Sequence, residues 1–264
     1  MNTRFLDFAE RQLLLTSYGF GHQPQRCIVI VPPFAEELNK CRRMMALLGR
    51  AASDAGMGCC YLDLSGTGDS EGEFANATWQ QWRDELESLL NWIELELPGV
   101  QIQLVGIRLG LLLALEQAAH QAVKRVIGWQ PVADGSRFIR QFLRLRVMAG
   151  MLDGGQREKV DDLRDQLAAG EPVDVAGYRL TQQLVSAIES RMLADLMEGC
   201  AVPLHWVEIQ SRAEPSLSPA AQKIVAAAAG RITSAAVSGE PFWSTVEITT
   251  APTLLDHTIR TVSA

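Results

Sequence analysis

Short apolar segments alternate with longer amphipathic segments through the first half of the chain. The apolar segments are continuous, as strands buried on both faces of a sheet are. In the amphipathic segments apolar residues recur at the spacing of one helical face. The predicted strands are 26–31, 58–64, 100–107 and 123–129, and the predicted helices between them are 35–55, 78–97 and 109–121. This alternation is typical of parallel strands joined by crossover helices.

The alternation changes after residue 135. Residues 136–200 have a mostly helical pattern, with one short extended stretch at 171–180. The sheet pattern then resumes with a strand, a helix and a last strand, at 202–209, 218–230 and 231–239. We therefore expect a single α/β domain with a mostly parallel, doubly wound sheet. Its core is expected to comprise 1–135 and 201–264, with 136–200 inserted as a helical cap.

A glycine-bracketed pentapeptide stands between the third predicted strand and its helix. Residues 102–115 read IQLVGIRLGLLLAL, with Gly106 and Gly110 flanking Arg108. A strand, G-x-S-x-G and a helix form the nucleophile elbow of α/β-hydrolases, so this order predicts that fold with a cap. Arginine stands where the serine is expected, and a guanidinium stays protonated and has no acceptor with which to attack a carbonyl. Ordinary serine-esterase chemistry is therefore not expected here.

Three interpretations of Arg108 remain open. In the first, the pocket is a binding site and the guanidinium clamps an anion such as a carboxylate or phosphate. In the second, Arg108 is structural and pairs with Glu36 or Glu37, because buried charges are normally paired. In the third, another group carries out the chemistry, and the candidates are Cys59, Ser70 and a water activated by His257.

Main-chain groups around the elbow are independent of the side chain at residue 108. The amide of Leu109 is expected to point into the pocket, and the loop with Phe34 and Ala35 is expected to offer a second oxyanion donor. The charged run that follows predicts a polar network at the pocket edge. In it, Glu36 accepts from Arg108, Asn39 bridges, and Arg42 or Arg43 faces the opening.

The sequence offers only weak candidates for the acid and the base of a catalytic triad. Glu208 and Glu214 follow or end the strand that resumes the sheet, where the acid belongs, although either also fits a solvated loop carboxylate. His257 lies late in the chain, where the histidine belongs, but it also fits the exposed face of a C-terminal helix. The other three histidines have no partner at metal-binding spacing, and we interpret them as structural.

Composition narrows the classes of function. The net charge of −7 and a pI near 5.2 argue against nucleic acid as a partner. The five cysteines lack C-x-x-C spacing, which favours reduced thiols in a cytoplasm and no metal. The glycine loop 65–72 has neither the P-loop lysine nor complete G-x-G-x-x-G spacing, so no cofactor is expected. No signal core or membrane-length apolar run is present, and a cytoplasmic location is expected.

The stretch 137–146 is a basic exception in this acidic chain. Its arginines alternate with Phe, Ile and Leu. It fits a cap helix with one solvated face, and it also fits a helix that docks on a membrane surface or a partner. Dimerisation through the cap is left open.

Several motifs resemble one bacterial family. Residues 32–86 (PPFAEELNKCRRMM…LDLSGTGDSEGEF…WQQWRDEL) and the stretch GEPFWSTVEI at 239–248 are similar to the exosortase A system-associated hydrolase 2 proteins, and GIRLG resembles that family's elbow. These proteins are encoded beside exosortase A and exopolysaccharide genes in bacteria with PEP-CTERM sorting. The resemblance implies an α/β-hydrolase fold and proteins of that system as partners. The family name rests on fold, so it says little about chemistry.

Together these features predict an α/β-hydrolase-like protein of that system, without a serine nucleophile, that binds or processes an acyl or anionic metabolite. A non-catalytic scaffold or binding module of the same fold is the alternative. A hydrolase with an unconventional nucleophile is a further alternative.

Overall fold

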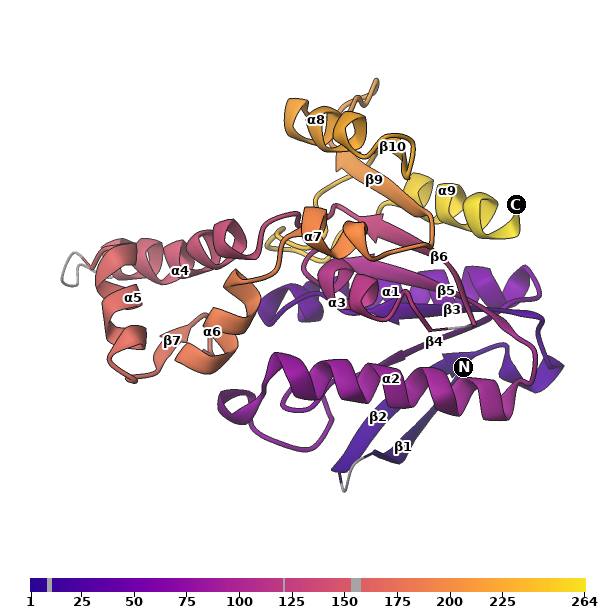
Figure 1. Cartoon of the computed structure of the whole chain (residues 1–264), viewed down its shortest axis with the longest axis horizontal. Coiled ribbons are helices and arrows are strands. Elements are labelled where there is room, and N and C mark those ends of the chain that lie inside the picture. Colours follow the sequence, from indigo (N-terminus) through magenta and orange to yellow (C-terminus); the bar gives the residue numbers. More distant parts are fainter. Residues whose placement is uncertain (9–10, 121, 153–157) are drawn as a thin grey trace.

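An eight-stranded sheet forms the centre of the molecule (Figure 1), and its strand order is β1-β2-β4-β3-β5-β6-β9-β10. The computed structural model describes residues 1–8, 11–120, 122–152 and 158–264. The last six strands in that order are parallel, and the hairpin of β1 (Asn2–Phe8) and β2 (Arg11–Tyr18) joins them antiparallel at one edge. The predicted mostly parallel sheet is confirmed.

Each parallel connection carries the helix that the pattern predicts. The order is β3 (Arg26–Val31), α1 (Glu36–Asp54), β4 (Gly58–Leu62), α2 (Trp79–Glu96), β5 (Gln101–Ile107), α3 (Gly110–Glu116) and β6 (Val123–Trp129). After the insertion, β9 (Leu204–Gln210), α8 (Pro219–Ala227), β10 (Ile232–Ser238) and α9 (Pro252–Ser263) complete it. α3 is shorter than predicted, and Gln121, its expected end, lies outside the described residues.

Helices cover both faces of the sheet. α1 and α9 pack on one face with Ile28 and Ile30, while α2 and α3 pack on the other with Cys27 and Val29. Successive strand residues point to opposite faces. Because both faces are buried, β3 is apolar at every one of these positions, which explains the continuous run in the sequence. None of the described helices is long and apolar enough to cross a membrane.

The insertion between β6 and β9 is largely helical. It contains α4 (Gly135–Leu152), α5 (Val160–Ala168), α6 (Gln182–Glu189) and α7 (Leu193–Glu198). The stretch predicted as extended forms a small hairpin of β7 (Val173–Val175) and β8 (Tyr178–Leu180). Figure 1 shows α4, α5 and α6 to one side of the sheet. The division of the chain into core and cap at residues 136 and 200 stays a prediction.

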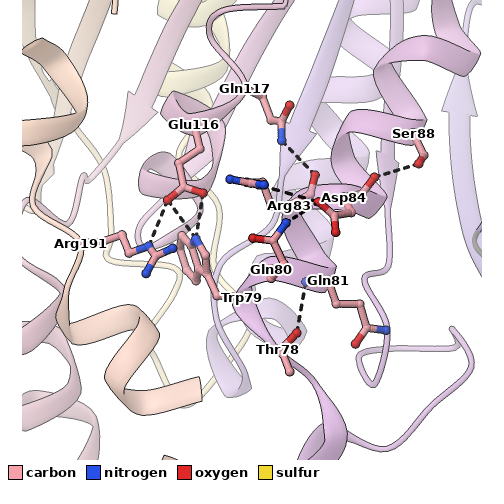
Figure 2. A network of polar contacts seen from close by, with 10 residues as sticks. All are labelled: Thr78, Trp79, Gln80, Gln81, Arg83, Asp84, Ser88, Glu116, Gln117 and Arg191. Carbon is pink, nitrogen blue, oxygen red and sulfur yellow. Dashed lines mark hydrogen bonds and ion pairs between the residues drawn. The ribbon is translucent and has the colours of Figure 1, made fainter. Parts of the chain in front are cut away.

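One carboxylate ties the insertion to the core (Figure 2). Glu116, at the end of α3, accepts from the indole Nε1 of Trp79 on α2 at 3.0 Å and from Nε of Arg191 at 3.0 Å. Arg191, which lies between α6 and α7, also stands over the Trp79 ring, 5.4 Å from its centroid. The Glu116 side chain is 12% exposed, so water replaces these contacts poorly if the carboxylate is removed.

Glu116→Ala is expected to lower the free energy of unfolding by about 2–4 kcal/mol, since it leaves a partly buried guanidinium and an indole N–H without their acceptor. Chemical denaturation measures this. Asp84→Ala is the control from the same network, because its contact with Arg83 at 3.8 Å is solvent-exposed and is expected to contribute less than about 0.5 kcal/mol. Equal effects of the two substitutions would contradict the role given to Glu116.

Candidate functional site

The backbone at Arg108 has the shape of a nucleophile elbow. Arg108 is the single residue between β5 and Leu109, which precedes α3, and its φ of +54° is rare for a residue with a side chain. A Cβ at Gly106 would lie 2.4 Å from Cα of Leu111, and one at Gly110 would lie 2.4 Å from the carbonyl oxygen of Pro32. Only glycine fits at both flanking positions, as the motif predicts.

The Arg108 side chain is held from three sides. Its Nε donates to Oε1 of Glu37 at 3.1 Å, and its Nη1 donates to the carbonyl oxygen of Gln130 at 3.3 Å. Its guanidinium carbon lies 5.3 Å from the ring centroid of Trp243, in the loop after the last strand. The start of α1 and the loops after β5, β6 and β10 therefore meet at this residue, as the carboxyl ends of strands do in open α/β sheets.

Glu37 is an unusual partner for this arginine. Its Oε2 is buried and has no hydrogen-bond partner among the described residues. Burial raises the pKa of Glu37, and the neighbouring Arg108 opposes that rise without cancelling it. The carboxyl group is therefore more readily protonated than an ordinary surface glutamate.

The predicted polar network is wrong in its partners. Glu36, at the solvent side of the same helical turn, pairs with Lys40 at 2.8 Å instead of Arg108. Asn39 donates to the Tyr178 hydroxyl of β8 at 3.1 Å and does not bridge to the elbow. Arg42 forms a two-point pair with Asp63, at 3.0 and 2.8 Å, instead of facing an opening. Glu37, the alternative partner for Arg108, is in place, and Arg43, the alternative to Arg42, is exposed on α1.

The expected oxyanion donors surround a very small space. Phe34, Ala35 and Leu109 line a cavity of about 30 Å³, together with Leu38 and Trp82. This is about the volume of one water molecule, too small for an ester or amide group with its substituents. Ala35 has a φ of +52° and a ψ of −125°, so the loop is locally strained. A role of these amides in oxyanion stabilisation stays a prediction.

Aromatic rings fill the space above that loop. The Phe34 ring makes edge contacts with Phe142 at 5.1 Å and with Phe74 at 5.6 Å between centroids. Phe142 lies on α4, so the insertion packs directly against the loop that holds Phe34.

Glu208 is a helix cap in this structure. It is buried on β9 and accepts from the Ser218 amide at 2.6 Å and from its hydroxyl at 2.8 Å, at the start of α8. This satisfies two donors at a helix N-terminus. The interpretation as a solvated loop carboxylate is wrong for Glu208. Glu214 is exposed in the following loop.

His257 does not reach the elbow. It lies on α9, and its Nε2 is 2.7 Å from Nε2 of His205 at the start of β9, with the two rings stacked. Elbow residues lie at the opposite, carboxyl ends of the strands. No histidine contacts Arg108 in the part of the chain that the structure describes, so the structure does not assemble a triad from residues 108, 208 and 257.

The histidine pair predicts acid sensitivity. Burial, then the charge of His257, lowers the pKa of His205 to about 4, whereas an unfolded histidine titrates near 6.5. The unfolded state therefore binds more protons between these values, so stability falls as pH drops below about 6.5. Allowing for partial exposure, we expect a loss of about 1 kcal/mol between pH 7 and pH 5.

Denaturation curves at several pH values measure that loss. The double variant His205→Gln/His257→Gln is expected to have a smaller pH slope than the wild type. The solvent-exposed His22 provides the control, and His22→Gln is expected to leave the slope unchanged. An unchanged slope in the double variant would show that other groups carry the acid sensitivity.

The alternative nucleophiles are engaged elsewhere. Cys59 is fully buried in β4, and burial raises its pKa well above the usual thiol value. The Ser70 hydroxyl donates to the Asp63 carbonyl and accepts from the Leu14 amide. Among the described residues, neither side chain has a hydrogen bond to an imidazole or carboxylate that would activate it. Within the described residues no group of three His, Cys, Asp or Glu side chains is arranged to hold a metal ion.

A large cavity adjoins the elbow, and the sequence pattern does not predict it. It has a volume of about 620 Å³ and lies among α4, α7, α8 and β9, with Arg108 in its wall. Its surface is mainly apolar, including Met197, Ile224 and Phe138, and it also carries Arg137. The only sequence signal for it is the alanine-rich helix at 219–228, whose small side chains leave this space open.

The fold and the elbow place the chain among proteins with the α/β-hydrolase fold. Est1E from Butyrivibrio proteoclasticus, solved with ferulic acid bound, superposes with a TM-score of 0.68 at 14% identity, covering 98% of this chain and 96% of that one. Mouse alpha/beta hydrolase domain-containing protein 10 gives 0.60 at 15% identity, with coverage of 100% and 99%. The thioesterase domain of the curacin biosynthetic pathway gives 0.58 at 13%, with coverage of 100% and 98%.

These similarities concern the fold alone. No family model matches the chain, and no curated protein sequence matches it. The predicted α/β-hydrolase fold is confirmed by the structural neighbours. Function must be argued from the site.

Proposed function

We propose that this protein is a binding module with an α/β-hydrolase fold, and that its ligand is an amphiphile with an acyl-type chain and an anionic group. The observation that carries this proposal is the pairing of an arginine at the elbow with an open apolar cavity beside it. A cation in a cavity wall favours an anionic ligand, and the apolar walls favour a hydrocarbon part.

The shape of the cavity supports a chain-like ligand. Its wall includes Glu208 and Trp206 on β9 and extends to Arg231 and Ile232, and Ile232 pairs with Leu204 at the start of that strand. Four residues of strand span about 13 Å. A slot of this length accommodates an extended acyl chain of medium length along the sheet.

Polar groups in the wall leave donors available. The Nε1 group of Trp206 is buried and has no hydrogen-bond partner in the described part of the chain. The Glu208 carboxylate is already hydrogen-bonded to Ser218, so it does not accept from these donors. Arg137 forms no ion pair with a described residue. Unsatisfied donors together with unpaired positive charge favour a ligand that brings acceptors.

Hydrolysis is disfavoured by the same geometry. The elbow side chain cannot act as a nucleophile, and Trp243 rather than an imidazole covers it. The resemblance of residues 32–86 to the exosortase A system-associated family supports a role of this binding module in such a system. Acyl or anionic intermediates of exopolysaccharide assembly are then the class from which its ligand comes.

Calorimetric titration of the purified chain with three ten-carbon amphiphiles tests the proposal. Decanoate is expected to bind, decanol more weakly, and decyltrimethylammonium least, because only the first brings an anion to the arginines. Fluorophosphonate probes and p-nitrophenyl esters are expected to give neither labelling nor turnover.

A matched pair of substitutions locates the binding. Ala227 lines the cavity and its neighbour Ala226 does not, although both are exposed on α8. Ala227→Trp is expected to weaken decanoate binding about tenfold or more, and Ala226→Trp is expected to leave it unchanged. Absence of binding by all three amphiphiles would favour a scaffold without a ligand, and labelling by the probe would favour catalysis.

A further inference from the structure

One face of α4 is exposed and has an unusual composition. Its exposed residues recur at alternating spacings of four and three, which places them in one row along the helix. From the first turn of α4 to the last, the row consists of Arg137, Gln141, Arg144, Met148 and Met151. Arg140 and Leu145 lie beside it. Its first half is basic and its second half is apolar.

Folding does not require the apolar half of this row. The opposite side of α4 already buries Ile139 and Leu143 completely. Met148 and Met151 are 62% and 59% exposed, and Leu145 is 42% exposed. Large apolar side chains that gather on one exposed face indicate an interaction surface more often than chance exposure does.

The basic half of the row forms no ion pairs within the residues that the structure describes. Arg137, Arg140 and Arg144 form no ion pair with any described residue, whereas Arg146, on another side of the helix, pairs with Glu158 at 2.8 Å. Three guanidinium groups without an ion-pair partner in the described part of the chain stand out on a protein whose net charge is −7. The row therefore favours an anionic partner that also accepts apolar side chains.

We propose that this face of α4, from Arg137 to Met151, docks on the surface of an anionic phospholipid bilayer. The guanidinium groups lie at the lipid phosphates, and the side chains of Leu145, Met148 and Met151 enter the boundary between headgroups and acyl chains. Nucleic acid would leave the apolar half without a partner. In Figure 1, α4 lies to one side of the sheet, and the residues of the row are exposed on it.

This proposal rests on α4 and not on the proposed ligand. It is tested by vesicle flotation of the full chain with phosphatidylcholine alone or mixed with phosphatidylglycerol. Flotation is expected with the mixed vesicles and not with phosphatidylcholine alone, and added salt is expected to reduce it. Arg140→Glu/Arg144→Glu is expected to lower the partition coefficient about tenfold or more. Met148→Ser/Met151→Ser is expected to weaken binding to the vesicles while leaving the salt dependence of that binding unchanged.

The matched control is Arg43→Glu/Arg50→Glu on α1, which makes the same change in net charge at two exposed helical arginines. It is expected to float like the wild type, and circular dichroism checks that every variant folds.

Equal loss of flotation with both arginine pairs, equal flotation with neutral vesicles, or no flotation would overturn the proposal. So would lipid-free dimerisation that the α4 substitutions abolish, because the face would then be an interface between two copies. Decanoate titration is expected to be unaffected by the substitutions at 140 and 144, so failure of one proposal is distinguishable from failure of the other.

Discussion

Gly110→Ala is expected to lower the free energy of unfolding by about 4 kcal/mol or more and to reduce the yield of soluble protein. The added Cβ would lie 2.4 Å from the carbonyl oxygen of Pro32 and 2.5 Å from that of Val31. Both are backbone atoms at the end of the central strand β3, so relief requires the strand or α3 to move. Chemical denaturation and the near-ultraviolet circular dichroism of the aromatic core measure the effect.

Gly150→Ala is the control for this substitution. Gly150 lies in α4, and a Cβ there meets no heavy atom within 4 Å. Alanine is expected to leave stability unchanged or to raise it by about 0.5–1 kcal/mol, because it lowers the entropic cost of forming a helix. If Gly110→Ala were as stable as Gly150→Ala, the close packing of the elbow against β3 would be contradicted.

The sequence predicts the core of the fold well because periodicity and burial agree there. The run RCIVIV is apolar throughout, and the structure buries β3 on both faces. The hairpin of β1 and β2 was not predicted, because β1 lies at the exposed edge of the sheet and its side chains are mostly solvent-exposed. Edge strands lack the apolar pattern that identifies buried strands.

The partners of Arg108 could be predicted only in part. Glu36 and Glu37 are adjacent at the start of α1, and the sequence does not determine which one faces the sheet. That depends on the unusual backbone of Ala35, which sets the direction in which the helix begins. Trp243 was missed because its contact with Arg108 brings together loops that are far apart in the chain. Such contacts depend on tertiary packing and leave no local periodic signal.

His257 shows the limit of position along the chain as evidence. A late histidine fits the order of a hydrolase triad, but the triad histidine belongs to the loop after the last strand. Here that loop, 239–251, contains no histidine, and His257 follows it within α9. His257 is the sixth residue of α9, and this displacement along the sequence places its side chain against His205 instead of the elbow.

Arg108→Ala is expected to lower the free energy of unfolding by about 3 kcal/mol at pH 7, since it leaves the Glu37 carboxylate buried without its partner. Neither Arg108→Ala nor Arg108→Ser is expected to have esterase activity, because no histidine lies beside residue 108 in the described structure. Denaturation at two pH values and a p-nitrophenyl ester assay measure these outcomes.

The pH dependence separates an electrostatic cause from simple loss of packing. Burial already raises the pKa of Glu37 in the wild type, and removing Arg108 removes the charge that opposes this rise. In Arg108→Ala the pKa of Glu37 in the folded state is therefore expected to lie further above that of the unfolded state, whose ordinary carboxyl pKa is near 4.3, so the folded state binds more protons as pH falls toward that value. Stability of this variant is lost as pH rises above about 4.3, so its deficit relative to the wild type is expected to shrink at pH 5.

Adding Glu37→Gln to Arg108→Ala is expected to recover much of the loss at pH 7 and to abolish the pH dependence of the deficit, because the amide carries no charge to desolvate. Glu37→Gln alone is expected to cost less than Arg108→Ala, since Arg108 keeps the carbonyl of Gln130 and the face of Trp243. A deficit that is independent of pH, and that the second substitution deepens, would mean that Arg108 acts by filling space. The charge at the elbow would then have no electrostatic role in holding the loops together.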